Sequence, residues 1–257
     1  MSDEIPRARR DAIADRLVQG QSVVAAALAV EFGVSEDAIR RDLRALAAEG
    51  RCRRVYGGAL PITSGWLPMA ARIGEGRERK QALARAAAAT IKPGELIFLD
   101  SGSTNLALTE YLPEDAELTV ATNSIDIASA VLQRQDLRLI MIGGAVNTMV
   151  GGCVDADAVL AITRMNIDRL FLGACAVSAN GISAFDLSDA SFKRTLLSVS
   201  RESLVLVTTD KLDQRAPHRI AAIKDIACFV IERDAPAAQL APLVKAGVSI
   251  LNPDPLV

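Results

Sequence analysis

The feature of this chain that most constrains its fold is a regular alternation, after residue 95, between short apolar runs and segments of helical periodicity. Each run has the length of one buried strand. Parallel strands need crossover connections, which helices provide, so the alternation predicts a mostly parallel sheet with helices on both faces. Strands are predicted near residues 96–100, 118–121, 138–142, 168–172, 203–208, 226–231 and 248–251, and the clearest helices near 104–112, 124–134, 155–164, 188–200 and 236–246.

The first 60 residues follow another pattern, of three short helices and a basic segment. Helices are predicted over residues 6–20 and 22–32, the second capped by the Ser22 hydroxyl. After a tight Gly-Val-Ser turn, a third helix is expected to begin at Ser35, which caps it, and to end at Gly50. Helices joined in this way predict a helix-turn-helix.

The third helix has one apolar face, formed by Ile39, Leu43 and Leu46 at spacings of four and three residues. Its arginines therefore lie on the opposite face or its flanks, and the basic segment "RCRRVYGGA" then predicts a wing. Residues 38–56 hold six arginines against two acids, within a chain of net charge −2, which indicates a polyanionic partner for this part alone. The residues predicted to contact double-stranded operator DNA are Ser35, Glu36, Ala38, Arg40, Arg41, Arg44, Arg51, Arg53 and Arg54.

Composition excludes several classes of function. Half of the residues are hydrophobic, so there is ample material for a core. The four cysteines are far apart and His218 is the one histidine, so the sequence predicts no metal site, no cofactor and no Ser-His-Asp triad. No apolar run reaches the ~18 residues of a membrane span, and no secretory signal is evident. We therefore expect a cytoplasmic protein without a membrane partner.

Polar residues follow three of the predicted strands where those strands end. The segment "DSGST" after the first strand offers hydroxyls and an open glycine, which suit a phosphate, whereas Asp100 is better suited to accept from sugar hydroxyls. Each such turn is also typical of ordinary βα connections. The ends of parallel strands meet at one edge of a sheet, so together they predict a cleft. Its predicted residues are Asp100, Ser101, Gly102, Ser103, Thr104, Thr122, Asn123, Ser124, Gly143 and Gly144.

The stretch "VSEDAIRRDLRALAAEGRCRRVYGGA" resembles the signature of DeoR-type transcriptional regulators. The resemblance extends to near residue 231 and includes Arg72, Lys80, "LDSGST", "TNS" and "FKRTLL". It implies a sensor domain similar in fold to ribose-5-phosphate isomerase, whose effectors are commonly phosphorylated sugars or sugar alcohols. It adds Lys193 and Lys211 as effector-binding residues.

The sequence departs from that family pattern at Ala38, Tyr56 and Thr208, where the family usually has Thr, His and Asp. The late strand ending "IERD" also departs from the family's "TD". Ala38 lacks a hydroxyl that could reach DNA, and Thr208 follows a strand that leads into the sensor site. The departure at Thr208 suggests an effector different from those of better-matching members.

The predicted fold is α/β, with a winged helix-turn-helix over residues 1–60, a linker over 61–76 and a Rossmann-like, mostly parallel sensor domain over 77–257. The predicted function is a transcriptional repressor of sugar or sugar-alcohol metabolism genes, a homodimer or homotetramer that a phosphorylated sugar releases from operator DNA. No enzymatic activity is expected. The alternatives are an isomerase-like enzyme with a DNA-binding appendage, and an architectural DNA-binding protein whose sensor is empty.

Overall fold

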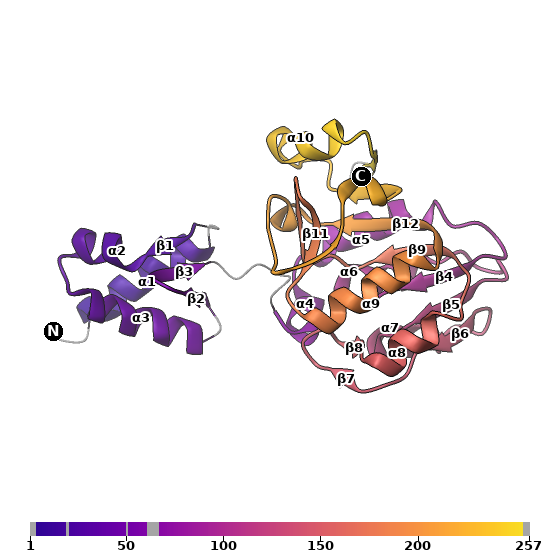
Figure 1. The fold of residues 1–257 in the computed structure, drawn as a ribbon, viewed down its shortest axis with the longest axis horizontal. Coiled ribbons are helices and arrows are strands. Elements are labelled where there is room, and N and C mark those ends of the chain that lie inside the picture. The colour runs from indigo at the N-terminus through magenta and orange to yellow at the C-terminus, as the bar shows by residue number, and fades with distance from the viewer. Residues whose placement is uncertain (1–3, 19–20, 50, 61–66, 254–257) are drawn as a thin grey trace. The chain divides into compact units, whose positions relative to one another are not determined.

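The computed structural model describes residues 4–18, 21–49, 51–60 and 67–253, and the chain divides into two compact units, Met1–Thr63 and Ser64–Val257 (Figure 1). The first unit contains a three-stranded antiparallel sheet of order β1-β3-β2 beside its helices. Its elements are α1 (Glu4–Val18), β1 (Val23–Val24), α2 (Ala25–Phe32), α3 (Glu36–Ala48), β2 (Arg53–Val55) and β3 (Gly58–Leu60).

The second helix of this unit begins later than predicted. Val23 and Val24 pair with Ala59 and Gly58 of β3, so the backbone there is extended and α2 starts at Ala25. The cap prediction for Ser22 was therefore wrong, because the residue preceding the helix is Val24, which makes no side-chain cap. The predicted end of α3 at Gly50 lies outside the described residues.

The first unit has its own core, and the apolar face of α3 lies within it. Ile39, Leu43 and Leu46 are at most 2% exposed and pack with Ile13 and Leu17 of α1. The predicted faces of α3 are therefore confirmed, and its arginines face away from the core.

The second unit is built on a sheet of seven parallel strands in the order β15-β14-β12-β9-β4-β5-β6. All seven correspond to predicted runs, and the α/β fold class is confirmed. The strands are β4 (Leu96–Leu99), β5 (Thr119–Thr122), β6 (Arg138–Met141), β9 (Ile167–Leu172), β12 (Ser200–Val207), β14 (Cys228–Ile231) and β15 (Ser249–Leu251). The helices are α4 (Met69–Gly74), α5 (Arg77–Ala88), α6 (Ser103–Leu108), α7 (Ile125–Val131), α8 (Ala156–Ile162), α9 (Leu187–Ser198) and α10 (Ala237–Lys245), with 3-10 turns at Thr109–Tyr111, Thr209–Lys211 and Ile223–Asp225.

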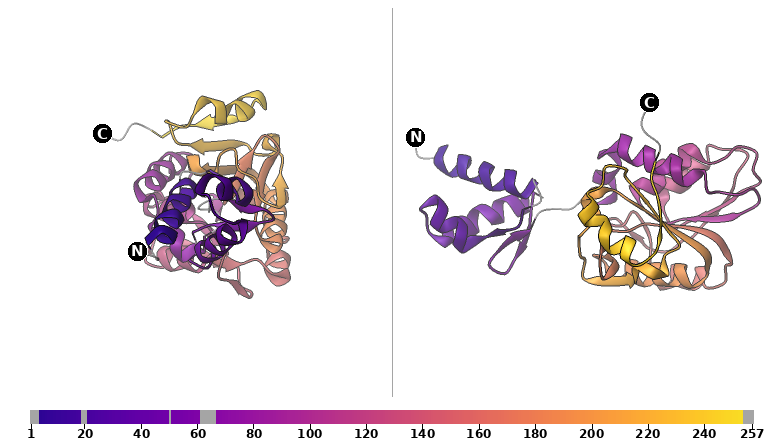
Figure 2. Two further views of the ribbon diagram at one scale, coloured as in Figure 1. Left: turned by 90° about the vertical axis from the view of Figure 1, so that its left-hand side faces the viewer. Right: turned by 90° about the horizontal axis from the view of Figure 1, so that it is seen from above.

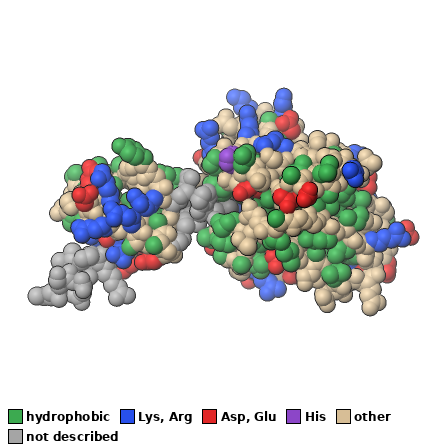
Figure 3. All heavy atoms as spheres, turned by 60° about the horizontal axis from the view of Figure 1, so that its bottom comes forward, with side chains coloured by type: hydrophobic (Ala, Val, Ile, Leu, Met, Phe, Trp, Pro, Cys, Tyr) green, Lys and Arg blue, Asp and Glu red, His purple; other side chains and the backbone are tan. Residues whose placement is uncertain are grey.

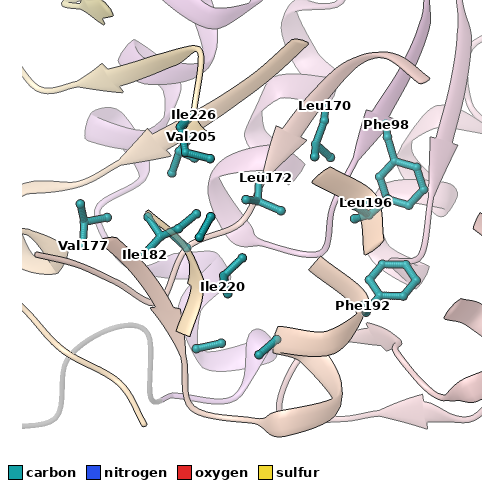
Figure 4. Packing of buried hydrophobic residues seen from close by; sticks show 14 of the residues in the cluster. Phe98, Leu170, Leu172, Val177, Ile182, Phe192, Leu196, Val205, Ile220 and Ile226 are labelled. Carbon is teal, nitrogen blue, oxygen red and sulfur yellow. The ribbon is translucent and has the colours of Figure 1, made fainter. Parts of the chain in front are cut away.

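Helices cover both faces of this sheet (Figure 2). Ile97 and Leu99 of β4 face α5, α6 and α7, whereas Phe98 faces α8 and α9. Figure 4 shows the second of these cores, in which the Phe98 ring lies beside the Phe192 ring of α9 with centroids 6.2 Å apart. No helix in the described ranges is both long and apolar enough to cross a membrane.

The sequence patterns did not predict several short elements. A hairpin of β7 (Val146–Asn147) and β8 (Gly152–Cys153) follows the sheet's edge strand, and a small antiparallel sheet is formed by β10 (Ala176–Ser178), β11 (Gly181–Ala184) and β13 (His218–Ala221). Their sequences place single apolar residues or pairs beside Gly, Ser, Asn, His or Arg, and so form no longer apolar run. Helix α4 lies inside the segment expected to be a linker, and its Met69 and Arg72 are buried.

Candidate functional site

Helix α3 presents arginines to solvent at its N-terminal half. The Ser35 hydroxyl accepts from the Ala38 amide at 3.3 Å, which caps the helix as predicted. Arg40, Arg41 and Arg44 are exposed. Figure 3 shows Arg side chains gathered on one face of this unit. The arrangement suits a recognition helix that meets phosphates and base edges in a major groove.

Two of these arginines, Arg40 and Arg51, pair weakly with nearby acids. Arg40 lies 2.7 Å from Glu36 and 3.3 Å from Asp37 on its own helix. Arg51 lies 3.7 Å from Glu49, and Arg54 of the hairpin is exposed. Exposed pairs of this kind contribute about 0–1 kcal/mol each, so they can be exchanged for DNA phosphates at little cost. The side chain of Arg53 lies outside the described residues, and Ala38 is half-buried.

One charged residue of α3 points the other way, a feature that the sequence reasoning missed. Asp42 is 3% exposed, and its carboxylate accepts from Arg9 of α1, with Nη2 to Oδ2 at 2.6 Å. Arg10 lies 3.6 Å from the same carboxylate. The ion pair therefore fixes the recognition helix against α1.

In the second unit, a cavity of about 280 Å³ lies where β4 and β9 end. The chain runs from β4 through β5 to β6 at one edge of the sheet, then returns to β9 on the other side of β4. The carboxyl ends of β4 and β9 therefore form the topological switch point, where ligands of open α/β sheets bind. The cavity is lined by Leu67, Arg72, Ser101, Gly102, Ser103, Thr104, Asn105, Met149, Val150, Gly173, Ala174, Cys175, Phe185, Asp186, Asp189, Lys193, Leu206 and Lys211.

Six residues predicted from the sequence line this cavity, namely Ser101, Gly102, Ser103, Thr104, Lys193 and Lys211. Two of them carry polar atoms without partners. Ser101 and Thr104 are 4% and 5% exposed, and their hydroxyl oxygens find no hydrogen-bond partner among the described residues. A buried polar group left unpaired costs about 1–3 kcal/mol, so these hydroxyls mark a site where a ligand can supply a partner.

The other predicted residues lie behind or beside the cavity. Thr122 donates to the Leu99 carbonyl at 2.6 Å, and the Asn123 carboxamide accepts from the Ser101 amide at 3.0 Å. Ser124 caps α7. These residues hold the turn after β4 in place and do not form the cavity wall. Gly143 and Gly144 are exposed, and the Asp155 carboxylate occupies the space that a Cβ on Gly144 would need.

Lys193 belongs to a buried cluster of three charges. Its ammonium lies 3.2 Å from the Asp100 carboxylate and contacts that of Asp189, one turn earlier on α9. Asp100 is fully buried and also accepts from the Gly173 amide at 2.8 Å. Burial raises the pKa of Asp100 to about 6, against the effect of Lys193, while the two carboxylates hold the pKa of Lys193 above its ordinary value despite burial. Much of the Lys193 charge is thus already neutralised.

Lys211 and Arg72 are the other cations that line the cavity. Burial lowers the pKa of Lys211, and the nearby Arg72 and Lys193 lower it further. Asp186 also lines the cavity, and its carboxylate caps α9 and accepts from the Asn147 side chain at 3.3 Å. The cavity therefore offers cations and hydroxyl donors for an anionic group beside carboxylates that can accept from hydroxyls.

Several of these residues were absent from the predicted effector-binding set. Asn105 donates to the carbonyls of Asp100 and Phe171, both at 2.8 Å, and so ties the turn after β4 to β9. Gly173 could have been predicted as a cavity residue, because it directly follows a predicted strand. Nothing in the local sequence marks Met149 or Val150, because they follow no predicted strand.

A basic helix-turn-helix unit and an α/β unit with a cavity at its switch point define the class of DNA-binding regulators that carry a sensor domain. Residues 9–65 match the DeoR-like helix-turn-helix domain, and residues 75–233 match the DeoR C terminal sensor domain. The chain belongs to the DeoR family, as its sequence motifs predicted.

Known relatives are similar over most of the chain. The glycerol-3-phosphate regulon repressor of Escherichia coli strain K12 is 30% identical over 210 residues, 80% of this chain and 83% of the relative. The L-fucose operon activator of the same strain is 29% identical over 239 residues, 91% of this chain and 98% of the relative. Among solved structures, ribose 5-phosphate isomerase A from Methanocaldococcus jannaschii is similar with a TM-score of 0.39 and 17% identity, over 53% of this chain and 55% of that one. That last similarity concerns the fold only.

Proposed function

We propose that this protein represses genes of sugar or sugar-alcohol metabolism, and that a phosphorylated sugar or sugar alcohol bound in the sensor cavity releases it from operator DNA. The observation that carries the ligand proposal is the pair of buried, unpartnered hydroxyls of Ser101 and Thr104 in the cavity wall. The cation of Lys211 lines the same cavity and suits phosphate oxygens, because charge-assisted hydrogen bonds are the stronger kind.

The size of the cavity and the names of the relatives support a small ligand. A cavity of about 280 Å³ lies near the lower end of the range for small-molecule sites, about 300–1,000 Å³. One relative is named for glycerol-3-phosphate and another for L-fucose. Asp186 and Asp189 can accept from the hydroxyls of such a ligand. We propose repression as the direction of regulation, as in the glycerol-3-phosphate regulon repressor.

The DNA-binding proposal assigns the reading of operator DNA to α3 and the wing. Helix-turn-helix proteins commonly bind two half-sites as two-fold dimers, so we propose a homodimer or homotetramer. A ligand shifts the DNA-bound population only through its different affinity for two conformations, and a coupling of about 1–3 kcal/mol would weaken operator binding by about 5- to 150-fold.

We further propose that the protein does not turn over its ligand. An isomerase needs a general base within reach of a substrate carbon. Asp100 is fully buried and held by Lys193 and the Gly173 amide, and Asp186 is engaged by Asn147 and the α9 cap. Incubation with ribose 5-phosphate should leave it unchanged. Conversion that disappears in Asp100→Asn would favour the isomerase alternative.

The test of the proposed function is a charge placed inside the cavity. A Cβ at Gly102 meets no atom closer than 3.9 Å, so Gly102→Ala is tolerated and serves as the control for Gly102→Asp. Thermal shift identifies which of ribose 5-phosphate, glucose 6-phosphate and glycerol 3-phosphate binds the wild type, and fluorescence anisotropy measures operator release. Gly102→Asp should bind operator and ignore that ligand, while Gly102→Ala responds. Normal release of Gly102→Asp would show that this turn is not the phosphate site.

A further inference from the structure

Strand β6 forms one edge of the seven-stranded sheet, and its outer side pairs with no other strand in the described ranges (Figure 1). The Ile142 amide donates inward, to the Thr122 carbonyl of β5 at 2.8 Å. Backbone groups of successive residues point to opposite sides of a strand, so the N–H and C=O groups of Leu139 and Met141 point outward. Free groups of this kind are a template for pairing with another strand.

The side chains along this edge are apolar, which distinguishes it from the opposite edge of the sheet. Ile140 and Met141 are 38% and 39% exposed. The opposite edge strand, β15, has three residues and is soon followed by Pro253, and proline is one of the residues that protect a strand edge from pairing. Strand β6 contains no proline, and its one charged residue is the first, Arg138. The edge at β6 is therefore open to a partner.

The two ends of β6 carry opposite charges on one face of the sheet. Ile142 packs in the same core as Phe98, and the exposed Arg138, four residues earlier, lies on the same face because side chains alternate along a strand. Asp155 caps α8 on this face and accepts from the Ala145 amide at 2.6 Å, so it lies just beyond the carboxyl end of β6. An antiparallel copy of β6 would therefore bring each arginine toward the acid of the other copy.

We propose that β6 pairs antiparallel with β6 of a second copy of this chain, across a two-fold axis at Ile140, so that two sensor units share one continuous sheet. Leu139 then lies opposite Met141 of the partner subunit, and each such pair exchanges two N–H···O=C bonds. Arg138 lies near Asp155 of the partner subunit. The symmetry of paired operator half-sites supports a second copy as the occupant, since a two-fold interface uses the same surface twice.

This inference rests on the proposed homodimer or homotetramer and adds the surface that forms it. Met141→Pro tests the backbone pairing, because it removes an outward N–H and leaves the inward amides of Ile140 and Ile142 in place. Met141→Leu keeps the N–H and is the matched control. Sedimentation velocity of the full chain measures the mass of each assembly. Met141→Pro should halve the wild-type mass, from dimer to monomer or from tetramer to dimer, whereas Met141→Leu should retain it.

Ile140→Cys tests the position of the axis. Residues that face each other in a non-hydrogen-bonded antiparallel pair have Cα atoms about 4.5 Å apart, within the range of about 4.4–6.8 Å that disulfides span. Mild oxidation should therefore give a covalent dimer on a non-reducing gel. The control is Val244→Cys, whose side chain is 64% exposed on α10. It should give no more dimer than the wild type, which has the same four native cysteines.

The charged ends of the strand are tested by Arg138→Glu, with the exposed Lys245→Glu on α10 as the control. Arg138→Glu should weaken dimerisation at least about tenfold, because it places an acid near Asp155 of the partner subunit, and like charges across an interface repel. Lys245→Glu should associate as the wild type does.

A monomeric wild type would overturn the inference. So would wild-type association of both Met141→Pro and Arg138→Glu, or the absence of a covalent dimer in Ile140→Cys. If Met141→Pro does not fold, the other two variants decide by these criteria. A wild type that assembles through β6 but is released from operator DNA by no phosphorylated sugar or glycerol 3-phosphate would overturn the proposed function and leave this interface intact.

Discussion

The two units use charged side chains in opposite ways. In the DNA-binding unit, Arg40, Arg41 and Arg44 are exposed, and Arg40 pairs with acids of its own helix. In the sensor unit, Lys193 and Asp100 are 2% and 0% exposed and pair across elements far apart in the chain. Surface arginines contribute little to the stability of the fold but are available to bind a polyanionic partner. The buried cluster instead determines the structure of the ligand site, because removing one of its charges would leave the others unpaired.

The largest expected effect tests whether the buried charged cluster stabilises the fold. Lys193→Met leaves the carboxylates of Asp100 and Asp189 buried without their cation, which should lower the free energy of unfolding by about 3–5 kcal/mol. Urea unfolding measures this change. The neighbouring exposed Arg194→Gln is the control and should change stability by less than about 1 kcal/mol. Equal losses in the two variants would show that the cluster matters no more than a surface charge.

The proposed DNA contacts of the exposed arginines are tested by changing Arg40, Arg41 and Arg44 together to Ala. Each contact to a base edge is worth about 1–3 kcal/mol, so operator affinity should fall by at least about 100-fold. Each lost phosphate contact should also reduce the salt dependence of binding by about 0.9 in the logarithmic slope. Anisotropy titrations at several salt concentrations measure both. Undiminished operator affinity would exclude α3 as the reading helix, and ligand affinity should stay unchanged.

A smaller effect separates ligand-binding hydroxyls from structural ones. The Thr104 hydroxyl is buried without a partner, so Thr104→Val should raise the free energy of unfolding by about 1 kcal/mol and weaken effector binding about tenfold. Thr122→Val is the matched change at a hydroxyl that donates to Leu99 and accepts from the Ser124 amide, and it should lower stability by about 1–3 kcal/mol. Thermal and urea unfolding give the signs. Destabilisation by both variants would argue that Thr104 has a structural partner.

The last test concerns a pH dependence of stability that arises from Lys80. Burial, with nearby Lys211 and Arg72, lowers the pKa of Lys80 from 10.5 to about 8. Between these values the unfolded chain holds a proton that the folded chain has released, so stability from this group rises as pH increases from 8 to 10. The wild type should therefore gain stability relative to Lys80→Met over this range. A constant difference between the two would show that Lys80 titrates normally.

The sequence predicted the fold better than it predicted the ligand site. Each of the seven sheet strands contains a short apolar run, and the central strand β4 is apolar throughout, because both of its faces are covered. The turn at residues 101–104 was also predictable, since it follows such a run directly. The contribution of Arg72 and of the turn at residues 149–150 was not, because these segments meet only through tertiary packing.

The ion pair of Lys193 with Asp100 is a second contact that the sequence did not predict. The family resemblance predicted Lys193 as an effector-binding cation, but it did not predict that Asp100, 93 positions earlier, would neutralise it. Local periodicity assigns a side chain to a face and leaves its partner undetermined. The DNA-binding unit was more predictable, because its proposed contacts project from one helix and one hairpin and need no distant partner.

The ion pair between Arg9 and Asp42 has a consequence for protein engineering. Asp42 lies among Ile39, Leu43 and Leu46 on the buried face of α3, and its cation comes from α1. A graft of residues 36–48 onto another helix-turn-helix scaffold would bring an acid into that scaffold's core without its arginine. A successful graft must therefore transfer the arginine as well, or replace Asp42 with leucine, which leaves every exposed arginine of the reading face in place.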